Sequence, residues 1–194
     1  MAEQMGPDRN AAEVTMTTAM LKAMAHPIRR EIMRYLAKAG HGRAADVGAA
    51  LGLPANQVSF HLRTLGEAGF IEVDETLARD RRDRVWKLIP QPRSLGSPEA
   101  PVADEQLGQV MLAQLWEDHQ LLARRLLAWV PEYVSGRTKE VHGTFLHSSV
   151  RTTPERFVAL VEQIQELLVA IPDEEPGPDV ALWDIALLAA DDQI

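Results

Sequence analysis

The stretch AADVGAALGLPANQVSFHLRTLGEAGF, residues 44–70, decides the fold of the N-terminal half. Its first part predicts a helix over Ala44–Leu51, ended by Gly52 in the left-handed conformation that glycine adopts readily. A second helix starts around Pro54 and turns an apolar stripe inward, formed by Val58, Leu62 and Leu65. Two short helices joined by Gly-Leu-Pro have the length of a helix-turn-helix.

The flanking segments complete this unit. Two upstream helices are predicted over Thr17–Ala25 and Pro27–Lys38, because proline ends the first helix and suits the first position of the second. Residues 1–13 have no apolar period, which is typical of a frayed tail. Downstream, residues 70–75 and 84–89 read as strands around a charged tip, which indicates a hairpin. A hairpin after a helix-turn-helix forms the wing of a winged helix-turn-helix.

The second half is predicted to begin with a linker at residues 90–101, which hold four of the twelve prolines. A long helix over Val102–Val130 then carries an apolar stripe spaced by threes and fours without sustained heptads, with Leu107, Val110, Met111, Leu115, Leu122, Leu126 and Trp129. The segments after it are predicted as a strand at 141–152, a helix from Thr153 to Ala170, a loop at 172–179 and, in preference to a short helix, a strand at 181–190. The fold class is therefore α+β, with a winged helix-turn-helix at 15–92, a long linking helix and a small acidic α/β domain at 100–194.

The N-terminal pattern resembles a known family. LKAMAHPIRREIMRYL at 21–36 and VSFHLRTLGEAGFIE at 58–72 together resemble the winged helix-turn-helix of the ArsR/SmtB bacterial repressors, over about residues 18–90. The second half resembles, more vaguely, the extended C-terminal region of actinobacterial regulators of this superfamily. The resemblance implies DNA reading by the second helix, above all by Ser59 and His61. The chain departs from the family at Pro54, where a capping Ser or Thr is usual, so the start of that helix can shift by one residue.

The second helix of the motif is the predicted DNA-reading element. In a helix-turn-helix this helix lies in the major groove and presents the residues between its core positions. Asn and Gln side chains pair bidentately with adenine, and Arg pairs with guanine. The outward set predicted to contact DNA is Asn56, Gln57, Ser59, Phe60, His61 and Arg63. The alternative is a solvated polar helix face.

The arginines at the hairpin tip are suited to binding a polyanion. The tip carries Arg79, Arg81, Arg82 and Arg84, and residues 79–84 have a net charge of +2 after Asp80 and Asp83 are counted. Such a hairpin suits phosphates or the minor groove, whereas a self-neutralising loop is the alternative. Arg43, before the helix at Ala44–Leu51, is a further candidate for a phosphate contact.

The charge distribution indicates that the two halves have different functions, with a basic N-terminal half suited to a polyanion and an acidic C-terminal half in another role. The net charge of −8 is the balance of +3 over residues 1–93 and −11 over residues 94–194. The chain has no cysteine, no stretch near the roughly 20 apolar residues of a membrane span and no secretory leader pattern. We therefore expect a soluble cytoplasmic, nucleoid-associated protein without a membrane partner.

Neither catalysis nor a metal or other cofactor is expected. The sequence contains no GxSxG, no HExxH, no glycine-rich phosphate loop and no convincing pair of carboxylates, so we expect no enzyme. Thiolate ligation is impossible, and Asp118-His119 has no second His or acid within residues 120–130. His142 and His147 fall on opposite faces of the strand expected there. We expect no metal site.

The aromatic residues of the second half have two interpretations. They are Trp116, Trp129, Tyr133, Phe145, Phe157 and Trp183. They serve as core and dimer anchors or, as the alternative, line a pocket for a small-molecule effector.

The sequence therefore predicts a regulator that binds double-stranded DNA specifically as a homodimer, and we expect a repressor rather than an activator. The long helix of the C-terminal half is the expected dimer contact, although it can instead pack on the helix at 153–170. A regulator with a true sensor domain, or a winged module for protein interaction that does not bind DNA, remains as an alternative.

Overall fold

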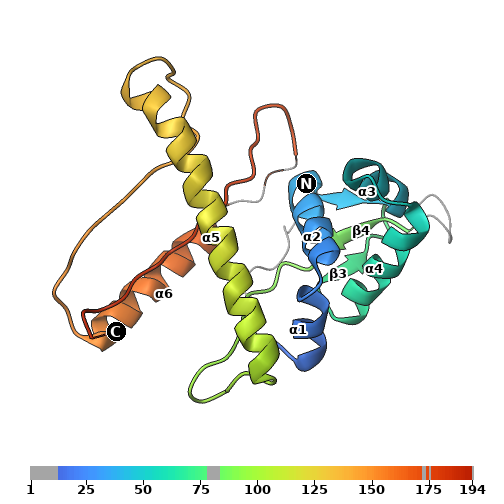
Figure 1. The fold of residues 1–194 in the computed structure, drawn as a ribbon, viewed down its shortest axis with the longest axis horizontal. Coiled ribbons are helices and arrows are strands. Elements are labelled where there is room, and N and C mark those ends of the chain that lie inside the picture. Colours follow the sequence, from blue (N-terminus) through green and yellow to red (C-terminus); the bar gives the residue numbers. More distant parts are fainter. Residues whose placement is uncertain (1–12, 78–83, 172–173, 175, 194) are drawn as a thin grey trace, which may run out of the picture. The chain divides into compact units, whose positions relative to one another are not determined.

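The structure is a computed structural model that describes residues 13–77, 84–171, 174 and 176–193 (Figure 1). The chain divides into two compact units. The first extends to Met111 and includes Ile171–Leu182, and the second comprises Leu112–Ala170 and Trp183–Ile194. No helix in the described residues is long and apolar enough to cross a membrane.

Four helices of the first unit follow the predicted plan. They are α1 (Thr18–Met24), α2 (Pro27–Ala39), α3 (Ala44–Leu51) and α4 (Ala55–Glu67). His26 is extended, with φ −92° and ψ 123°, and Pro27 opens α2, which separates α1 from α2 as expected. Arg29 of α2 donates to the carbonyl oxygens of Ala23 and Lys22, so it caps the end of α1.

The sheet of the first unit forms the predicted wing. Strands β2 (His41–Gly42), β4 (Trp86–Leu88) and β3 (Ile71–Val73) form an antiparallel sheet in that order. Within the hairpin Ile71 lies opposite Leu88 and Val73 opposite Trp86. The two strands therefore confirm the hairpin, although they are shorter than predicted.

A second, smaller pairing was not predicted. Strand β1 (Val14–Thr15), which directly follows the predicted tail, pairs in parallel with β5 (Arg93–Ser94), which lies within the predicted linker. Arg93 donates to the carbonyl oxygen of Gly69 at 2.7 Å and lies over the ring of Phe70 at 4.7 Å. The predicted linker is therefore anchored to the winged domain at its start.

The core lies between these helices and the sheet. Its buried residues come from all four helices and the hairpin and include Leu21, Ile32, Leu36, Val47, Val58, Leu62, Leu65, Phe70, Ile71 and Trp86. Met111 also belongs to this core, so the N-terminal turns of α5 (Glu105–Val134) are part of the winged domain.

The second unit is helical in its regular part. It holds most of α5 together with α6 (Pro154–Ala170), whose start is capped by Thr153: its hydroxyl oxygen accepts from the Arg156 backbone N–H at 3.4 Å. The strands predicted at 141–152 and 181–190 are wrong, because both segments lack regular secondary structure. An alternating pattern becomes a strand only when a neighbouring strand supplies hydrogen bonds, and none lies there among the described residues. The chain remains an α+β protein.

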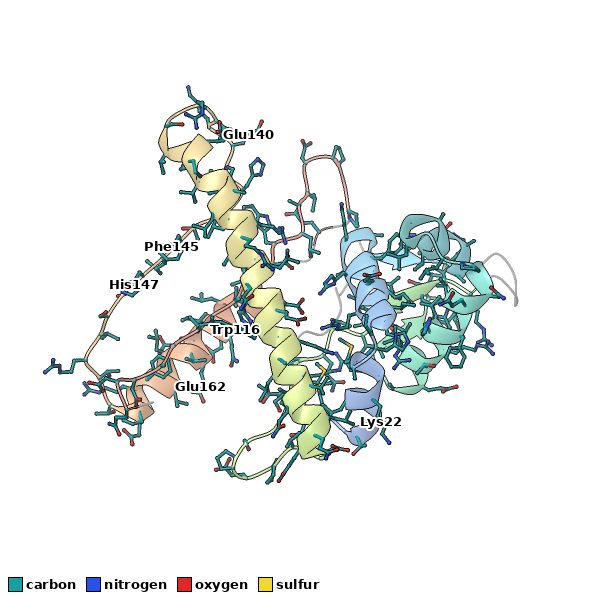
Figure 2. All side chains as sticks on the ribbon, in the orientation of Figure 1. Lys22, Trp116, Glu140, Phe145, His147 and Glu162 are labelled. Carbon is teal, nitrogen blue, oxygen red and sulfur yellow. The ribbon has the colours of Figure 1, made fainter. Side chains whose placement is uncertain are left out.

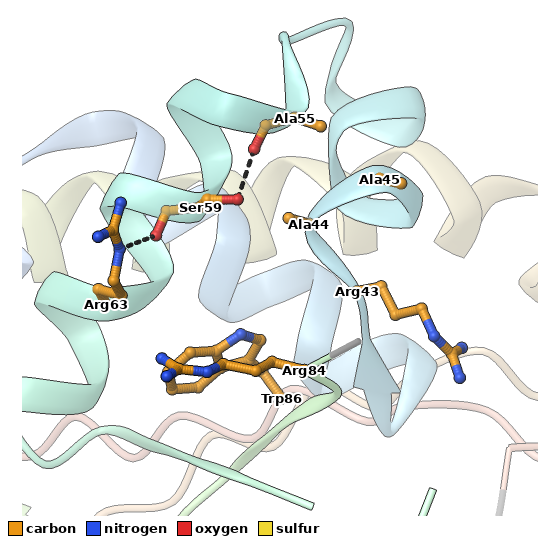
Figure 3. Close-up of a pocket in the computed structure, with 8 residues that line it drawn as sticks. All are labelled: Arg43, Ala44, Ala45, Ala55, Ser59, Arg63, Arg84 and Trp86. Atoms are coloured by element: carbon orange, nitrogen blue, oxygen red, sulfur yellow. Dashed lines mark hydrogen bonds between the residues drawn. The ribbon is translucent and has the colours of Figure 1, made fainter. Parts of the chain in front are cut away.

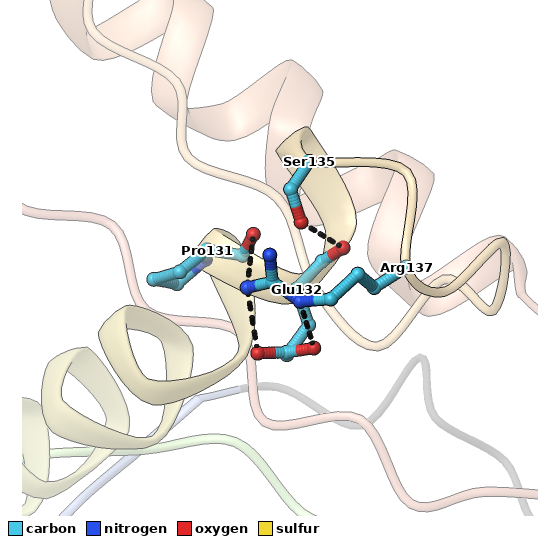
Figure 4. Close-up of polar contacts among 4 residues, drawn as sticks. All are labelled: Pro131, Glu132, Ser135 and Arg137. Atoms are coloured by element: carbon cyan, nitrogen blue, oxygen red, sulfur yellow. Dashed lines mark hydrogen bonds and ion pairs between the residues drawn. The ribbon is translucent and has the colours of Figure 1, made fainter.

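The C-terminal end of α5 is fixed by one arginine. Pro131 lies within its last turn, and the Arg137 guanidinium donates to both carboxylate oxygens of Glu132, at 2.6 and 2.8 Å (Figure 4). The same arginine lowers the pKa of Glu132. Ser135 donates to the Glu132 carbonyl oxygen, and Gly136 has φ +73°, so the helix ends here.

Candidate nucleic-acid interface

The turn between α3 and α4 sets the geometry of the interface. Gly52 has φ +68° and ends α3 as predicted, and the Leu53 N–H donates to the Gly48 carbonyl oxygen at 2.9 Å. A Cβ atom added at Gly48 would lie 2.6 Å from the Leu53 carbonyl oxygen. The two helices are therefore joined by a backbone contact that only glycine permits.

The α4 helix starts one residue after the position proposed for its beginning. Pro54 is extended, with φ −61° and ψ 135°, and is the N-cap without a side-chain cap. The Asn56 side-chain oxygen accepts from the Gln57 N–H at 2.9 Å, within the uncapped first turn. The inward stripe is as predicted, with Val58, Leu62 and Leu65 fully buried.

The predicted DNA-contacting residues of α4 lie mostly on one exposed side. Asn56, Gln57 and Arg63 are exposed, Phe60 has 58% of its surface exposed, and Ser59 is half-buried. Two of them bond to their own helix, because Ser59 donates to the Ala55 carbonyl oxygen at 2.8 Å and Arg63 to that of Ser59 at 3.2 Å. These bonds use the Ser59 hydroxyl hydrogen and the Arg63 Nε–H, so the Ser59 hydroxyl oxygen and the two terminal nitrogens of Arg63 remain available to a base.

His61 is the exception, and the prediction that it points outward is wrong. It is 5% exposed, and its ring lies 4.7 Å from that of His26, centroid to centroid. Phe60 lies edge-on to it at 5.5 Å. Because burial and the nearby His26 and Arg29 disfavour the charged form, the pKa of His61 is lowered. His61 therefore attaches α4 to the α1–α2 junction and cannot reach a base from this position.

Acidification is expected to destabilise the first unit through His61. Its pKa is lower in the folded chain than the ordinary value of about 6.5, so the unfolded chain binds more protons below that pH. The contribution of His61 to the free energy of unfolding is fully present above pH 6.5 and falls as the pH decreases toward the pKa of the folded chain. The free energy of unfolding, measured with denaturant between pH 7.5 and 5, should fall less steeply with decreasing pH in His61→Leu than in wild type. His147→Gln, which changes an exposed histidine, is the control and should keep the wild-type slope; an unchanged slope in His61→Leu would contradict the assignment.

Three arginines border a hollow beside α4. The hollow has a volume of about 480 Å³ and is lined by Arg43, Ala44, Ala45, Ala55, Ser59, Arg63, Arg84 and Trp86 (Figure 3). The three cations come from the start of α3, the middle of α4 and the end of the wing loop. Arg43 donates to the Leu77 carbonyl oxygen at 3.2 Å, and its guanidinium is 3.9 Å from Asp46. A cationic hollow of this kind suits the phosphates of a nucleic-acid backbone.

The other wing arginines, Arg79, Arg81 and Arg82, lie outside the described residues. Sequence reasoning found each arginine of the hollow but not that they border the same hollow, because they lie on three different elements. Trp86 was missed: its ring forms part of the hollow's wall, and only the tertiary fold places it there.

Four of the six aromatic residues of the second half are not core residues in this structure. Trp116, Tyr133, Phe145 and Trp183 are exposed, and Figure 2 shows Trp116 and Phe145 on the surface. Across the described ranges, no three His, Cys, Asp or Glu side chains come together in a way that could hold a metal ion.

Comparisons with known proteins identify the N-terminal domain. A family model described as a helix-turn-helix domain matches residues 24–74. Residues 24–74 are a helix-turn-helix domain. With the β3–β4 hairpin behind it, this domain is a winged helix-turn-helix, the kind of module with which many transcription regulators bind DNA.

Whole-chain likenesses are weak. No curated protein matches the chain. A homodimeric winged helix-turn-helix DNA-binding domain from Mycobacterium bovis, Mb0332, is 22% identical, with 52% of this chain and 76% of that chain covered and a TM-score of 0.33. YusO from Bacillus subtilis is 15% identical over 80% of this chain and 83% of that chain, with a TM-score of 0.34. The Zα domain of Carassius auratus PKZ, solved with Z-DNA, is 22% identical over 34% of this chain and 97% of that chain, with a TM-score of 0.29. Likenesses at this level carry no argument about function.

Proposed function

We propose that this protein is a homodimeric transcription regulator that binds double-stranded DNA in a sequence-specific manner. The arginine hollow beside the exposed side of α4 carries the proposal, because it places cations next to side chains able to read bases. In the proposed complex α4 lies in the major groove, and Asn56, Gln57 and Arg63 reach base edges. Arg43 and Arg84 contact phosphates on either side.

The proposed regulatory effect is repression. A dimer bound across two half-sites about 34 Å apart covers promoter DNA that a polymerase needs. The protein supplies recognition rather than catalysis, and no metal or cofactor enters the proposal. A small-molecule effector acting on the second unit is a secondary candidate, supported only by the exposed aromatic residues there.

Gln57→Ala is expected to weaken binding to the specific site by about 1–3 kcal/mol, if the amide pairs with a base. Affinity for unrelated DNA should change much less, since base contacts carry the sequence information. The site is found by selecting bound fragments from genomic DNA, and both affinities are then measured at several salt concentrations. Glu67→Gln, at the exposed far end of α4, is the matched control. Equal loss on every sequence would mean that Gln57 contacts only the backbone.

The wing gives a separate prediction. Replacing Arg81 and Arg82 with alanine should weaken binding to all DNA sequences alike and flatten the salt dependence, because phosphate contacts are not sequence-specific. An affinity that does not depend on salt in the wild-type chain would instead support the alternative of a protein-interaction module. Unchanged affinity in the double variant would remove the wing from the interface.

A further inference from the structure

Phe60 is the one large apolar side chain that α4 exposes in the described structure. Its exposed fraction is 58%, whereas the inward apolar stripe of the same helix is fully buried. Residues three or four positions apart on a helix are neighbours on its surface. Phe60 is therefore flanked by Asn56 and Gln57 toward the helix N-terminus and by Arg63 on the other side. The ring lies at the centre of the face that the proposed complex turns toward DNA.

Two histidines hold the Phe60 ring in place. The His61 ring meets it edge-on, with 5.5 Å between centroids and an interplanar angle of 70°, and the His26 ring lies 4.7 Å from that of His61. Edge-to-face contact is a favoured geometry between aromatic rings. Because His61 is 5% exposed and packed into the domain, it restricts the directions that the exposed ring can take. Phe60 therefore presents a fixed apolar surface.

The major groove offers an apolar ring one kind of partner. Among the base edges in this groove only thymine carries a methyl group, at C5, next to its O4 acceptor. The neighbours of Phe60 on α4 end in amides or a guanidinium, which bond to nitrogen and oxygen atoms of base edges and make no hydrogen bond to a methyl group. An apolar side chain gains by burying that methyl group from water. The chemistry of this face therefore favours a thymine opposite Phe60.

We propose that Phe60 reads the 5-methyl group of a thymine in the specific DNA site. This inference rests on the DNA binding of the proposed function and names one base that α4 recognises. Arg63, beside Phe60, also borders the cationic hollow together with Arg43 and Arg84. These cationic surroundings favour a polyanion over an apolar protein as the group that covers the ring.

Deoxyuridine tests the contact with the wild-type chain, because it differs from thymidine only in lacking the 5-methyl group. The specific site is selected from genomic fragments, and each of its thymines is replaced in turn by deoxyuridine. At one thymine or more, the Kd of the full chain should rise about 4-fold, the factor expected for one methyl-sized group that is no longer buried. The other thymines should tolerate the replacement.

Phe60→Ala shows whether the ring makes this contact. The variant should bind the specific site more weakly, and deoxyuridine should then raise the Kd no further, since no ring remains to meet the methyl group. The ring is exposed, so the fold should persist, which thermal unfolding checks. Gln57→Ala is the matched control on the same face. It weakens the site through a different base contact and should keep the full effect of deoxyuridine.

His61 acts on this contact as a positioning residue. His61→Leu keeps the buried position apolar but removes the aromatic edge, so the effect of deoxyuridine should fall below about 2-fold. His61→Phe retains an aromatic ring and should restore the effect, a result that general destabilisation of the domain would not produce. A full effect of deoxyuridine in His61→Leu would contradict this positioning role.

The outcomes separate the thymine contact from the proposed function. A chain that binds all DNA sequences alike, or none, contradicts sequence-specific binding and the thymine contact with it. A chain that binds its site but tolerates deoxyuridine at every thymine overturns the thymine contact alone. A deoxyuridine effect of equal size in Phe60→Ala also overturns it, since the methyl group would then meet another side chain. Wild-type affinity in Phe60→Ala would overturn it too, and would assign the exposed ring to an apolar protein partner.

Discussion

Gly48→Ala is expected to destabilise the winged domain strongly and to abolish DNA binding. Helix propensity alone would predict the opposite sign, since glycine inside a helix costs about 1 kcal/mol relative to alanine. Steric overlap outweighs that gain, because the new Cβ would lie 2.6 Å from the Leu53 carbonyl oxygen. This neighbour is backbone, held by the turn between α3 and α4, and cannot rotate away. We expect a decrease of about 3 kcal/mol in the free energy of unfolding, which corresponds to a drop of about 10 °C in Tm.

Gly52→Ala is the matched control for this variant. No atom lies within 4 Å of the position where its Cβ would be placed, but its φ of +68° disfavours alanine. That substitution should cost about 1 kcal/mol and leave DNA binding measurable. Thermal unfolding and DNA affinity are measured on both variants. A Gly48→Ala protein as stable as wild type would show that the turn can relax, and the helix-turn-helix would then be less tightly joined than the close approach implies.

The N-terminal domain could be predicted from local signals, and His61 shows where polarity misleads. Gly52 predicted the observed end of α3, and His26-Pro27 predicted the break between α1 and α2. The hairpin pattern placed the wing. His61 lies three residues after Val58 and four before Leu65, so spacing alone places it on the buried stripe. Its polarity suggests a DNA contact instead. The position on the helix determines that His61 is buried, and burial in turn lowers its pKa.

The second half could not be predicted to the same degree, because its regular structure depends on distant partners. The pairing of β1 with β5 joins two residues from one end of the winged domain to two residues from the other end. Strands this short show no alternating pattern in the sequence. Residues 141–152 alternate in sequence, yet no strand in the described residues lies beside them. A chain ending near Pro92, the natural cut if residues 90–101 were a free linker, would lack β5 and the core residue Met111. Point variants in the full chain are therefore the sounder test of the second unit.

Replacing Arg43, Arg63 and Arg84 together with alanine is expected to reduce affinity for the specific site by a factor of about 10² to 10³ near physiological salt, because two phosphate contacts and one base contact are lost. All three border the same hollow, and none contributes to the buried core, so the fold should persist. The slope of log K against log salt should become less steep by about 0.9 for each phosphate that is no longer neutralised, or about 2 for Arg43 and Arg84 together.

The slope separates the roles of the three arginines. Replacing Arg43 or Arg84 alone with alanine should make the salt dependence less steep. Each replacement should weaken binding to all DNA sequences equally. Arg63 lies on α4, and its two terminal nitrogens remain available to a base while its Nε–H donates to the Ser59 carbonyl oxygen. If Arg63 reads guanine, Arg63→Ala should weaken the specific site by about 1–3 kcal/mol more than unrelated DNA. Arg156→Ala on α6 removes one exposed arginine from the second unit and is the charge-matched control for each single variant. A triple variant with the wild-type slope would show that the hollow does not hold phosphates, and the DNA-binding face would then have to lie elsewhere on the winged domain.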